Sequence, residues 1–269
     1  MHGKYYSTKV RPTIAASSQH AAAYTAKDVL FGWTAVQIPR GSARLISATA
    51  IVRGKGDANG TANPFAMDLW FADDDRNALA ASNAVTNGAN AGIPTRDIIG
   101  GIELAVNGYR EFGDNNMVQV VTSGPTIKAD SLNKNNVDNL VITPKMSLDV
   151  NANPTVMGYS TFYMAGIAQG AFDWQSITAI AEAGAAEAAS TQAITTDGTS
   201  TDNTEQFAIG DVLHIGTSAG TPAADSPIGT VAAVATNLIT LEAVSETALV
   251  DGDILYNINP VEIVLSFEY

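Results

Sequence analysis

The stretch Val261-Glu-Ile-Val-Leu-Ser-Phe-Glu268 decides the fold class. Its odd-numbered side chains are all large and apolar, whereas the even-numbered ones are mostly polar. A period of two is typical of a β-strand that has one face in a core and the other in water. Asn259-Pro260 stands just before this stretch and marks a break, so we expect a separate final strand.

Similar strand-like stretches fill the first two thirds of the chain. Segments rich in Gly, Asn and Pro separate them and interrupt regular structure. Many short strands predict an all-β fold, with a β-sandwich or jelly-roll domain over residues 28–175. In the stretch of residues 43–53, Ile46, Ala48, Ala50 and Val52 fall on one face. The expected strands cover residues 29–38, 43–53, 65–72, 98–106, 117–122, 140–143, 146–150 and 155–168, with one short helix near residues 77–82.

A second group of short apolar runs precedes the final strand. It begins with Phe207-Ala-Ile-Gly210-Asp211-Val-Leu-His-Ile215, continues through residues 228–234 and 237–241, and ends at residues 249–256. Gly or Asp closes each run, as in strands joined by tight turns. We therefore expect a small β-barrel-like module over residues 176–257. It is inserted if residues 258–269 return to the first sheet; otherwise two domains stand in tandem.

The first 27 residues lack this apolar pattern and are small, polar and basic. We expect an N-terminal arm over residues 1–27. Residues 15–23 are too short and unpatterned to predict a helix. The beginning of the chain shows no apolar run of a secretory signal, and no stretch approaches the length of a membrane span.

Charge is distributed unevenly along the chain. The net charge is −13, yet residues 1–60 hold eight Lys or Arg against two Asp, and no Lys or Arg follows Lys145. A cation-free second half argues against a nucleic-acid partner, because phosphate binding needs cations. The alternatives left open are a basic end that docks on an acidic surface and a body kept soluble by its acidic charge.

No motif in the sequence predicts catalysis, and we expect no catalytic, cofactor-binding or metal-binding residues. Gly216-Thr-Ser218-Ala-Gly220 matches a nucleophile elbow, but prolines follow it and no His comes after His214. The chain has no Cys and three scattered His. Asp73-Asp74-Asp75 and Asp251-Gly-Asp253 lack the spacing of a calcium loop. Trp33, Trp70 and Trp174 fit a core better than a sugar platform.

Three stretches resemble structural proteins of tailed bacteriophages: Asp28-Val-Leu-Phe-Gly-Trp33, Ile38-Pro-Arg-Gly-Ser-Ala-Arg-Leu45 and Phe65-Ala-Met-Asp-Leu-Trp-Phe-Ala72. The Gly-Asp and Ile-Gly-Thr-Val phrases of the C-terminal module are similar to small β modules of phage virions. The resemblance implies a capsid decoration (cement) protein on the outer capsid surface. It implies the major capsid protein and further copies of this chain, in a homotrimer, as partners.

The basic arm is the expected contact with the capsid. Our hypothesis is that Lys4, Tyr5, Tyr6, Lys9 and Arg11 lie on an acidic capsomer surface. No membrane, nucleic acid or cofactor is part of this reading. The alternative is a tail, baseplate or fibre-associated protein whose C-terminal module binds a host glycan.

Overall fold

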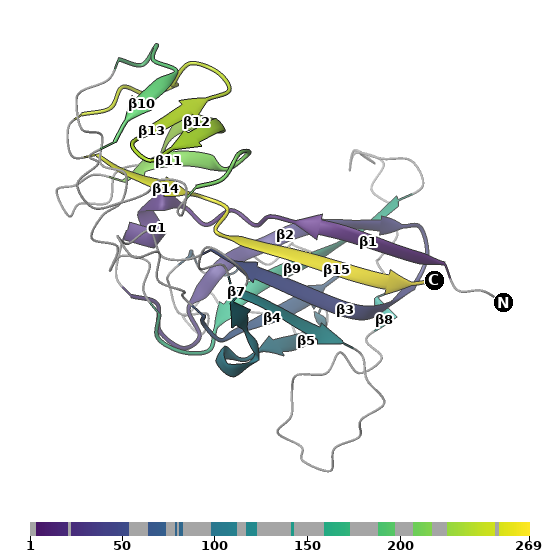
Figure 1. Ribbon diagram of the computed structural model, residues 1–269. Coiled ribbons are helices and arrows are strands. Elements are labelled where there is room, and N and C mark those ends of the chain that lie inside the picture. Colours follow the sequence, from purple (N-terminus) through teal and green to yellow (C-terminus); the bar gives the residue numbers. More distant parts are fainter. Residues whose placement is uncertain are drawn as a thin grey trace.

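The computed structural model describes residues 4–20, 23–53, 64–73, 79, 81–82, 98–111, 117–122, 141–142, 159–172, 188–196, 207–216, 225–250 and 253–269. These residues form a β-sandwich of two sheets and a smaller β module at one end of it (Figure 1). Every strand pair is antiparallel. The predicted all-β sandwich fold is confirmed.

The six-stranded sheet of the sandwich is built around the last strand of the chain. Its order is β1-β15-β3-β7-β6, and β8 also pairs with β3. The side chains of β15 alternate between buried and half-buried along its whole length, as the sequence predicts. The strands are β1 (Tyr5–Val10), β3 (Ala43–Val52), β6 (Arg110–Glu111), β7 (Met117–Thr122), β8 (Val141–Ile142) and β15 (Val261–Glu268).

The four-stranded sheet packs against it and has the order β2-β9-β4-β5. Its strands are β2 (Val29–Pro39), β4 (Met67–Ala72), β5 (Ile98–Leu104) and β9 (Tyr159–Ala168), and the 3₁₀ turn η1 (Val106–Gly108) follows β5. Phe162 meets Phe267 of the facing sheet edge-on, with ring centroids 5.9 Å apart. Such aromatic contacts join the inner faces of the two sheets into one core.

A glycine on the inner face of β9 makes room for one large ring. Gly166 pairs with Phe31 of β2 and with Leu69 of β4. A Cβ atom at residue 166 would lie 2.3 Å from a ring carbon of Phe31, whose side chain is 1% exposed. The ring of Phe31 therefore fills the space that a side chain at residue 166 would need.

One predicted strand face is wrong in part. The register between β15 and β3 shifts where Ser266 pairs with Ser47 and Phe267 with Leu45, a bulge at Ile46. The extra residue turns Leu45 inward, so Leu45 is fully buried and Ile46 only half-buried. The predicted strand at 146–150 lies outside the described residues. Of the predicted helix at 77–82, residues 77, 78 and 80 also lie outside them, and residues 79, 81 and 82 are not helical.

The module has its own five-stranded sheet and its own core. The strand order is β10-β13-β12-β11-β14, and the described strands do not close into a barrel. Three residues separate the end of β14 from the start of β15 of the sandwich, so the module strands lie between β9 and β15 in sequence. They are β10 (Ala193–Thr195), β11 (Val212–Gly216), β12 (Ser226–Ala235), β13 (Leu238–Leu241) and β14 (Ile254–Asn257).

Residues 5–20 are not the arm that the sequence predicts. Residues 5–10 form β1, which pairs with β15 over its full length, and Ala16–His20 form a short helix, α1. One face of β1 packs on the sandwich, and its other face exposes Tyr5, Ser7 and Lys9. Ala16 is buried in the module core, and tertiary packing of this kind stabilises a helix too short to form alone.

Three strands begin after the same aspartate turn. Asp28, Asp211 and Asp253 are all buried. In each turn a carboxylate oxygen of Asp accepts a hydrogen bond from the backbone N–H three residues earlier, at 2.6–2.8 Å. The Asp backbone N–H returns a bond to the carbonyl of that earlier residue. The residue before the Asp has a positive φ in two of these turns, 79° at Lys27 and 87° at Gly210.

Lys27 holds a conformation that suits glycine, so Lys27→Gly is expected to stabilise the protein. The gain in the free energy of unfolding is about 0.5–1 kcal/mol, because relief of the left-handed strain exceeds the added freedom of the unfolded chain. The matched reverse change is Gly210→Ala. Its Cβ would meet nothing within 4 Å, so the expected loss of about 1 kcal/mol reports backbone strain alone. Urea unfolding measures both, and a loss of stability in Lys27→Gly would contradict the assignment.

Candidate functional site

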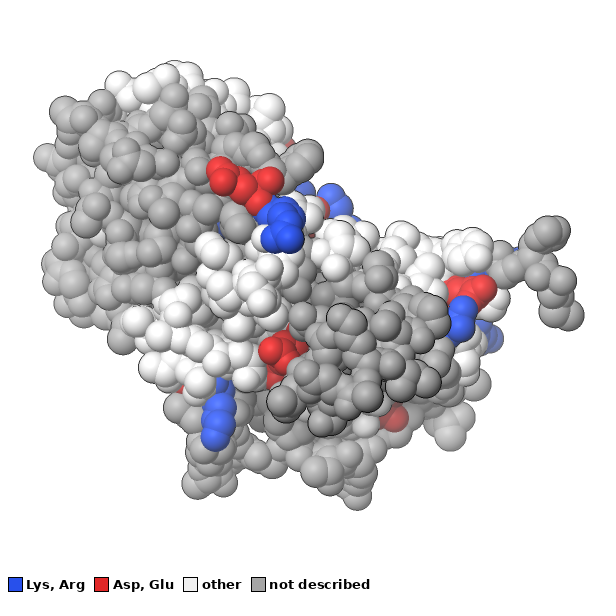
Figure 2. Space-filling model, turned by 60° about the horizontal axis from the view of Figure 1, so that its bottom comes forward, with Lys and Arg blue, Asp and Glu red and all other residues white. Residues whose placement is uncertain are grey.

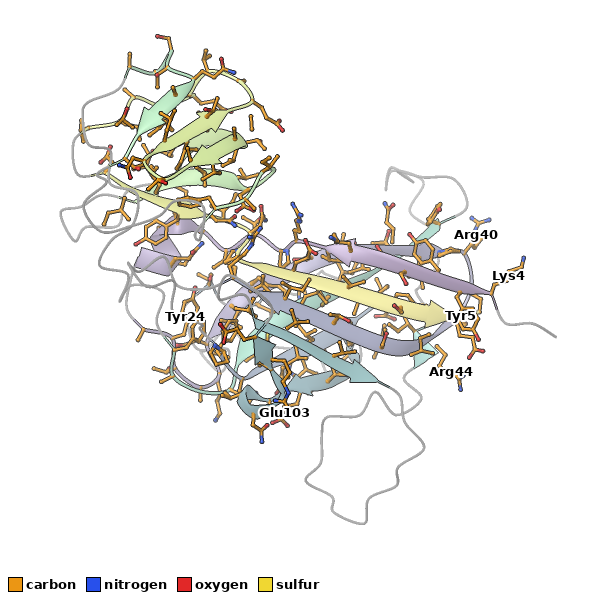
Figure 3. All side chains as sticks on the ribbon, viewed as in Figure 1. Lys4, Tyr5, Tyr24, Arg40, Arg44 and Glu103 are labelled. Carbon is orange, nitrogen blue, oxygen red and sulfur yellow. The ribbon has the colours of Figure 1, made fainter. Side chains whose placement is uncertain are left out.

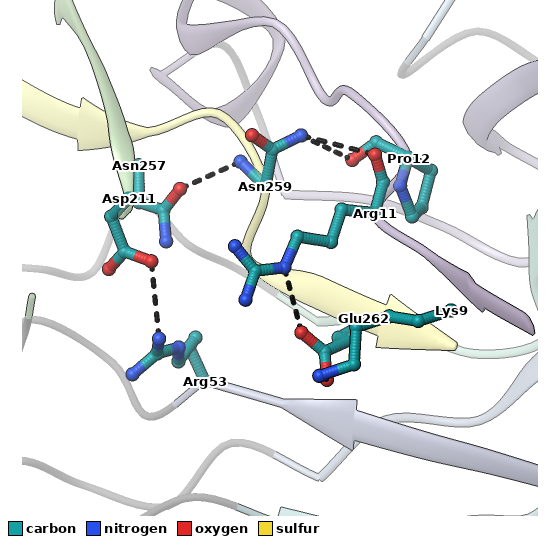
Figure 4. Close-up of polar contacts among 8 residues, drawn as sticks. All are labelled: Lys9, Arg11, Pro12, Arg53, Asp211, Asn257, Asn259 and Glu262. Carbon is teal, nitrogen blue, oxygen red and sulfur yellow. Dashed lines mark hydrogen bonds and ion pairs between the residues drawn. The ribbon is translucent and has the colours of Figure 1, made fainter. Parts of the chain in front are cut away.

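A cleft lies where the module meets the six-stranded sheet. Its volume is about 520 Å³, and the described residues that line it are Lys9, Arg11, Ile51, Arg53, Val118, Asp211, Asn259, Pro260 and Glu262. We call this set the junction cleft. Figure 2 shows acidic and basic side chains side by side where the two bodies of the molecule, the sandwich and the module, meet. Figure 4 shows how β1, β3, β15 and the start of β11 bring them together.

Glu262 of β15 binds two cationic side chains from β1 and the residues just after it. Its carboxylate lies 2.7 Å from Nζ of Lys9 and accepts a hydrogen bond of 2.8 Å from Nε of Arg11. Burial alone would raise the pKa of Glu262, but the hydrogen bonds and charges of Lys9 and Arg11 lower it below its ordinary value. Glu262 therefore adds stability above its unfolded pKa, and that stability is lost as the pH falls through its folded pKa.

Asp211 and Arg53 connect the two bodies. Nη2 of Arg53 lies 3.1 Å from Oδ1 of Asp211, whose side chain is 4% exposed. Burial raises the pKa of Asp211, and Arg53, the N–H of Ala208 and Arg11 oppose that rise. The second oxygen of Asp211 is held by the N–H of Ala208 in the turn before β11. The carboxylate is thus fixed in place.

Amide side chains hold the linker between β14 and β15. Nδ2 of Asn259 donates to the carbonyls of Arg11 and Pro12, at 3.3 and 3.1 Å (Figure 4). The backbone N–H of Asn259 donates to Oδ1 of Asn257. On the other side, Nε2 of Gln19 in α1 donates to the carbonyls of Ile14 and Asn257. These bonds set the position of the module relative to β1 and β15.

A second surface lies at the end of the sandwich away from the module. Figure 3 places Lys4, Tyr5, Arg40 and Arg44 there. All four side chains are exposed, Tyr5 to 71%. Arg44 is paired with Glu268. We call these four residues the distal patch.

Three tyrosine rings pack near the distal patch. The ring of Tyr6 lies 6.2 Å from that of Tyr159 and 6.5 Å from that of Tyr269, between ring centroids. Burial raises the pKa of Tyr269 to about 12. Tyr159 remains 40% exposed. This end of the sandwich therefore carries packed aromatic side chains beside the cations.

The structure divides the five residues predicted to contact a capsid. Lys4 and Tyr5 belong to the distal patch, whereas Tyr6 packs into the tyrosine cluster. Lys9 and Arg11 belong to the junction cleft, where both bind Glu262. Arg40, Arg44 and Arg53 were missed as site residues. Their only signal in the sequence was membership of the basic first segment.

The remaining candidates from the sequence do not form a site in the described residues. His214 lies on β11, and burial lowers its pKa while Asp225 and Glu246 oppose that change. Asp253 holds the turn before β14. Ser218, Trp174, Asp74, Asp75 and Asp251 lie outside the described residues. Within the part of the chain that the structure describes, there is no cluster of three or more His, Cys, Asp or Glu suited to a metal, and no helix long and apolar enough to cross a membrane.

Comparison with known proteins gives no relative. No family model matches the chain, and no curated protein or solved structure is significantly similar to it.

Proposed function

We propose that this protein is a structural component of a tailed-phage virion, a decoration protein that attaches to the outer surface of the capsid. The observation that supports this most directly is the position of the distal patch, at the opposite end of the molecule from the module (Figures 1 and 3). Attachment through the patch leaves the module projecting from the shell. The resemblance of the sequence to phage structural proteins supports the same role.

The chemistry of the distal patch suits an acidic protein surface. It combines two Arg, one Lys and an exposed Tyr, and the described acid beside it is Glu268, paired with Arg44. Arg and Tyr are residue types that dominate the binding energy of protein interfaces. The module carries only acidic charge, since no Lys or Arg occurs after Lys145. An acidic capsid surface would attract the patch and repel the module, which would orient the protein as it binds.

Reversal of charge in the distal patch tests the proposal. In the double variant Lys4→Glu/Arg40→Glu we expect at least tenfold weaker binding to particles that lack the protein, because two attractive charges become repulsive. Co-sedimentation with purified particles measures the binding. Deletion of residues 1–12 is a poorer test, because it would remove β1 and leave β15 unpaired on one side.

The matched control reverses two exposed charges of the module, in Glu242→Lys/Glu246→Lys. Binding in this variant should match that of the original protein. Equal binding of both variants, or loss only in the module variant, would contradict docking through the patch. Loss in the module variant would favour the alternative role, in which a tail or fibre protein uses the module.

Copy number and assembly complete the proposal. A decoration protein is present in hundreds of copies per particle, whereas a tail or baseplate protein is present in a handful, and quantitative gels of purified virions separate these cases. We include the homotrimer in the proposal by analogy with such proteins. Light scattering of the purified protein should give the mass of three chains.

A further inference from the structure

We propose that the junction cleft binds a small organic anion, whose carboxylate or phosphate lies between Arg11 and Arg53 and whose apolar body packs against Ile51, Val118 and Pro260. This proposal is independent of the docking role, because the cleft and the distal patch lie at different ends of the sandwich.

Two guanidinium groups line the cleft, and each has N–H donors beyond those used in its ion pair. Arg11 binds Glu262 through Nε, and Arg53 binds Asp211 through Nη2. Each guanidinium has five N–H donors, so these contacts leave several in each group. In Figure 4 the terminal nitrogens of Arg11 point away from Glu262, toward the side of the cleft where Asp211 and Arg53 lie. Planar Arg groups of this kind hold carboxylate and phosphate oxygens in pairs.

The charges of the described lining favour an anion. Lys9, Arg11 and Arg53 supply three positive charges, and Asp211 and Glu262 supply two negative ones. The two carboxylates hold the cations in place without neutralising all of them. One added negative charge would balance the cleft.

The size and the walls of the cleft indicate more than a bare ion. A volume of about 520 Å³ lies in the range of pockets for organic ligands. Ile51 of β3, Val118 of β7 and Pro260 of the linker add an apolar wall beside the cations. An anion with an apolar body would use both parts of the cleft. Because Asp211 belongs to the module and Arg53 to the sandwich, such a ligand would also join the two bodies.

The test uses three probes with the intact protein: inorganic phosphate, phenyl phosphate and benzoate. Titration calorimetry at constant ionic strength measures the binding of each. We expect saturable binding, with phenyl phosphate about tenfold tighter than inorganic phosphate because its ring covers the apolar wall. Binding of benzoate as well would show that the site accepts either oxyanion. Binding of phenyl phosphate alone would assign the site to phosphate.

Arg11→Gln should weaken binding of phenyl phosphate at least tenfold, because a charge-assisted hydrogen bond is lost. Lys9 still binds Glu262 in this variant, and thermal unfolding verifies that it folds. The matched control is Arg44→Gln, since Arg44 also pairs with a Glu of β15 and its side chain is 47% exposed against 44% for Arg11. Binding in Arg44→Gln should change less than twofold. Absence of saturable binding of all three probes, or equal weakening in both variants, would overturn the proposal.

Discussion

Replacement of Gly166 by alanine is expected to lower the free energy of unfolding by about 3 kcal/mol. The new Cβ atom would lie 2.3 and 2.7 Å from two ring carbons of Phe31, far inside van der Waals contact. Phe31 is buried in the core between the sheets, so its ring can move only by displacing other side chains. Urea unfolding of the purified variant measures the loss.

Two further variants separate the clash from a general effect of alanine in a strand. At Gly32, next to Phe31 in β2, a Cβ atom would meet nothing within 4 Å, so Gly32→Ala should change stability by less than about 0.5 kcal/mol. In a Phe31→Leu background, Gly166→Ala should cost much less than it does alone, because the ring is gone. An unchanged penalty in that background would show that Phe31 is not the cause.

The second large effect is expected from Arg53→Met, which leaves the carboxylate of Asp211 buried without its cation. We expect a loss of about 2–3 kcal/mol at neutral pH. Arg44→Met serves as the control, because Arg44 belongs to an exposed ion pair and its loss should cost less than about 1 kcal/mol. Chemical unfolding of both variants gives the comparison.

The penalty of Arg53→Met should depend on pH. Burial raises the pKa of Asp211 in the folded protein, so folding becomes less favourable as the pH rises from the unfolded pKa through the folded one. Arg53 opposes this rise, and its removal extends the interval to higher pH. The loss of stability should therefore be smallest below the unfolded pKa of Asp211 and largest above its folded pKa in the variant. Asp211→Asn in the same background should remove the pH dependence, and an equal loss at all pH values would contradict this account.

Sequence patterns predicted those strands whose two faces differ. The final strand alternates without a fault, and stretches 29–38, 43–53 and 117–122 match β2, β3 and β7 to within a residue or so. β1 escaped prediction because Val10 is its only fully buried residue and Ser7, Thr8 and Lys9 interrupt any apolar pattern. α1 escaped because five residues are too short for a helical period, and contact with the module stabilises it. The bulge at Ile46 has no signal in the composition of β3.

For the distal patch and the junction cleft, the sequence predicted only that the first segment is basic. Arg40 and Arg44 lie at the turn between β2 and β3, and the pairing of β1 with β15 and of β15 with β3 brings Lys4 to the same end. Arg53 and Asp211 are separated by 158 positions in the chain. The sequence shows Gly210-Asp211 as a turn before an apolar strand. The burial of Asp211 and its pairing with Arg53 depend on the assembled fold.

The place of β15 has a consequence for how the chain folds as it is made. The last strand lies between β1 and β3, and β1 has no other strand partner among the described residues. The pairing of Tyr5 with Glu268 joins residues at opposite ends of the sequence. Contacts of such long sequence separation form slowly, because the loop between them must close first. During synthesis the module and the four-stranded sheet are complete before the six-stranded sheet can close. The nascent chain therefore carries two open strand edges until β15 has been synthesised and can pair with them.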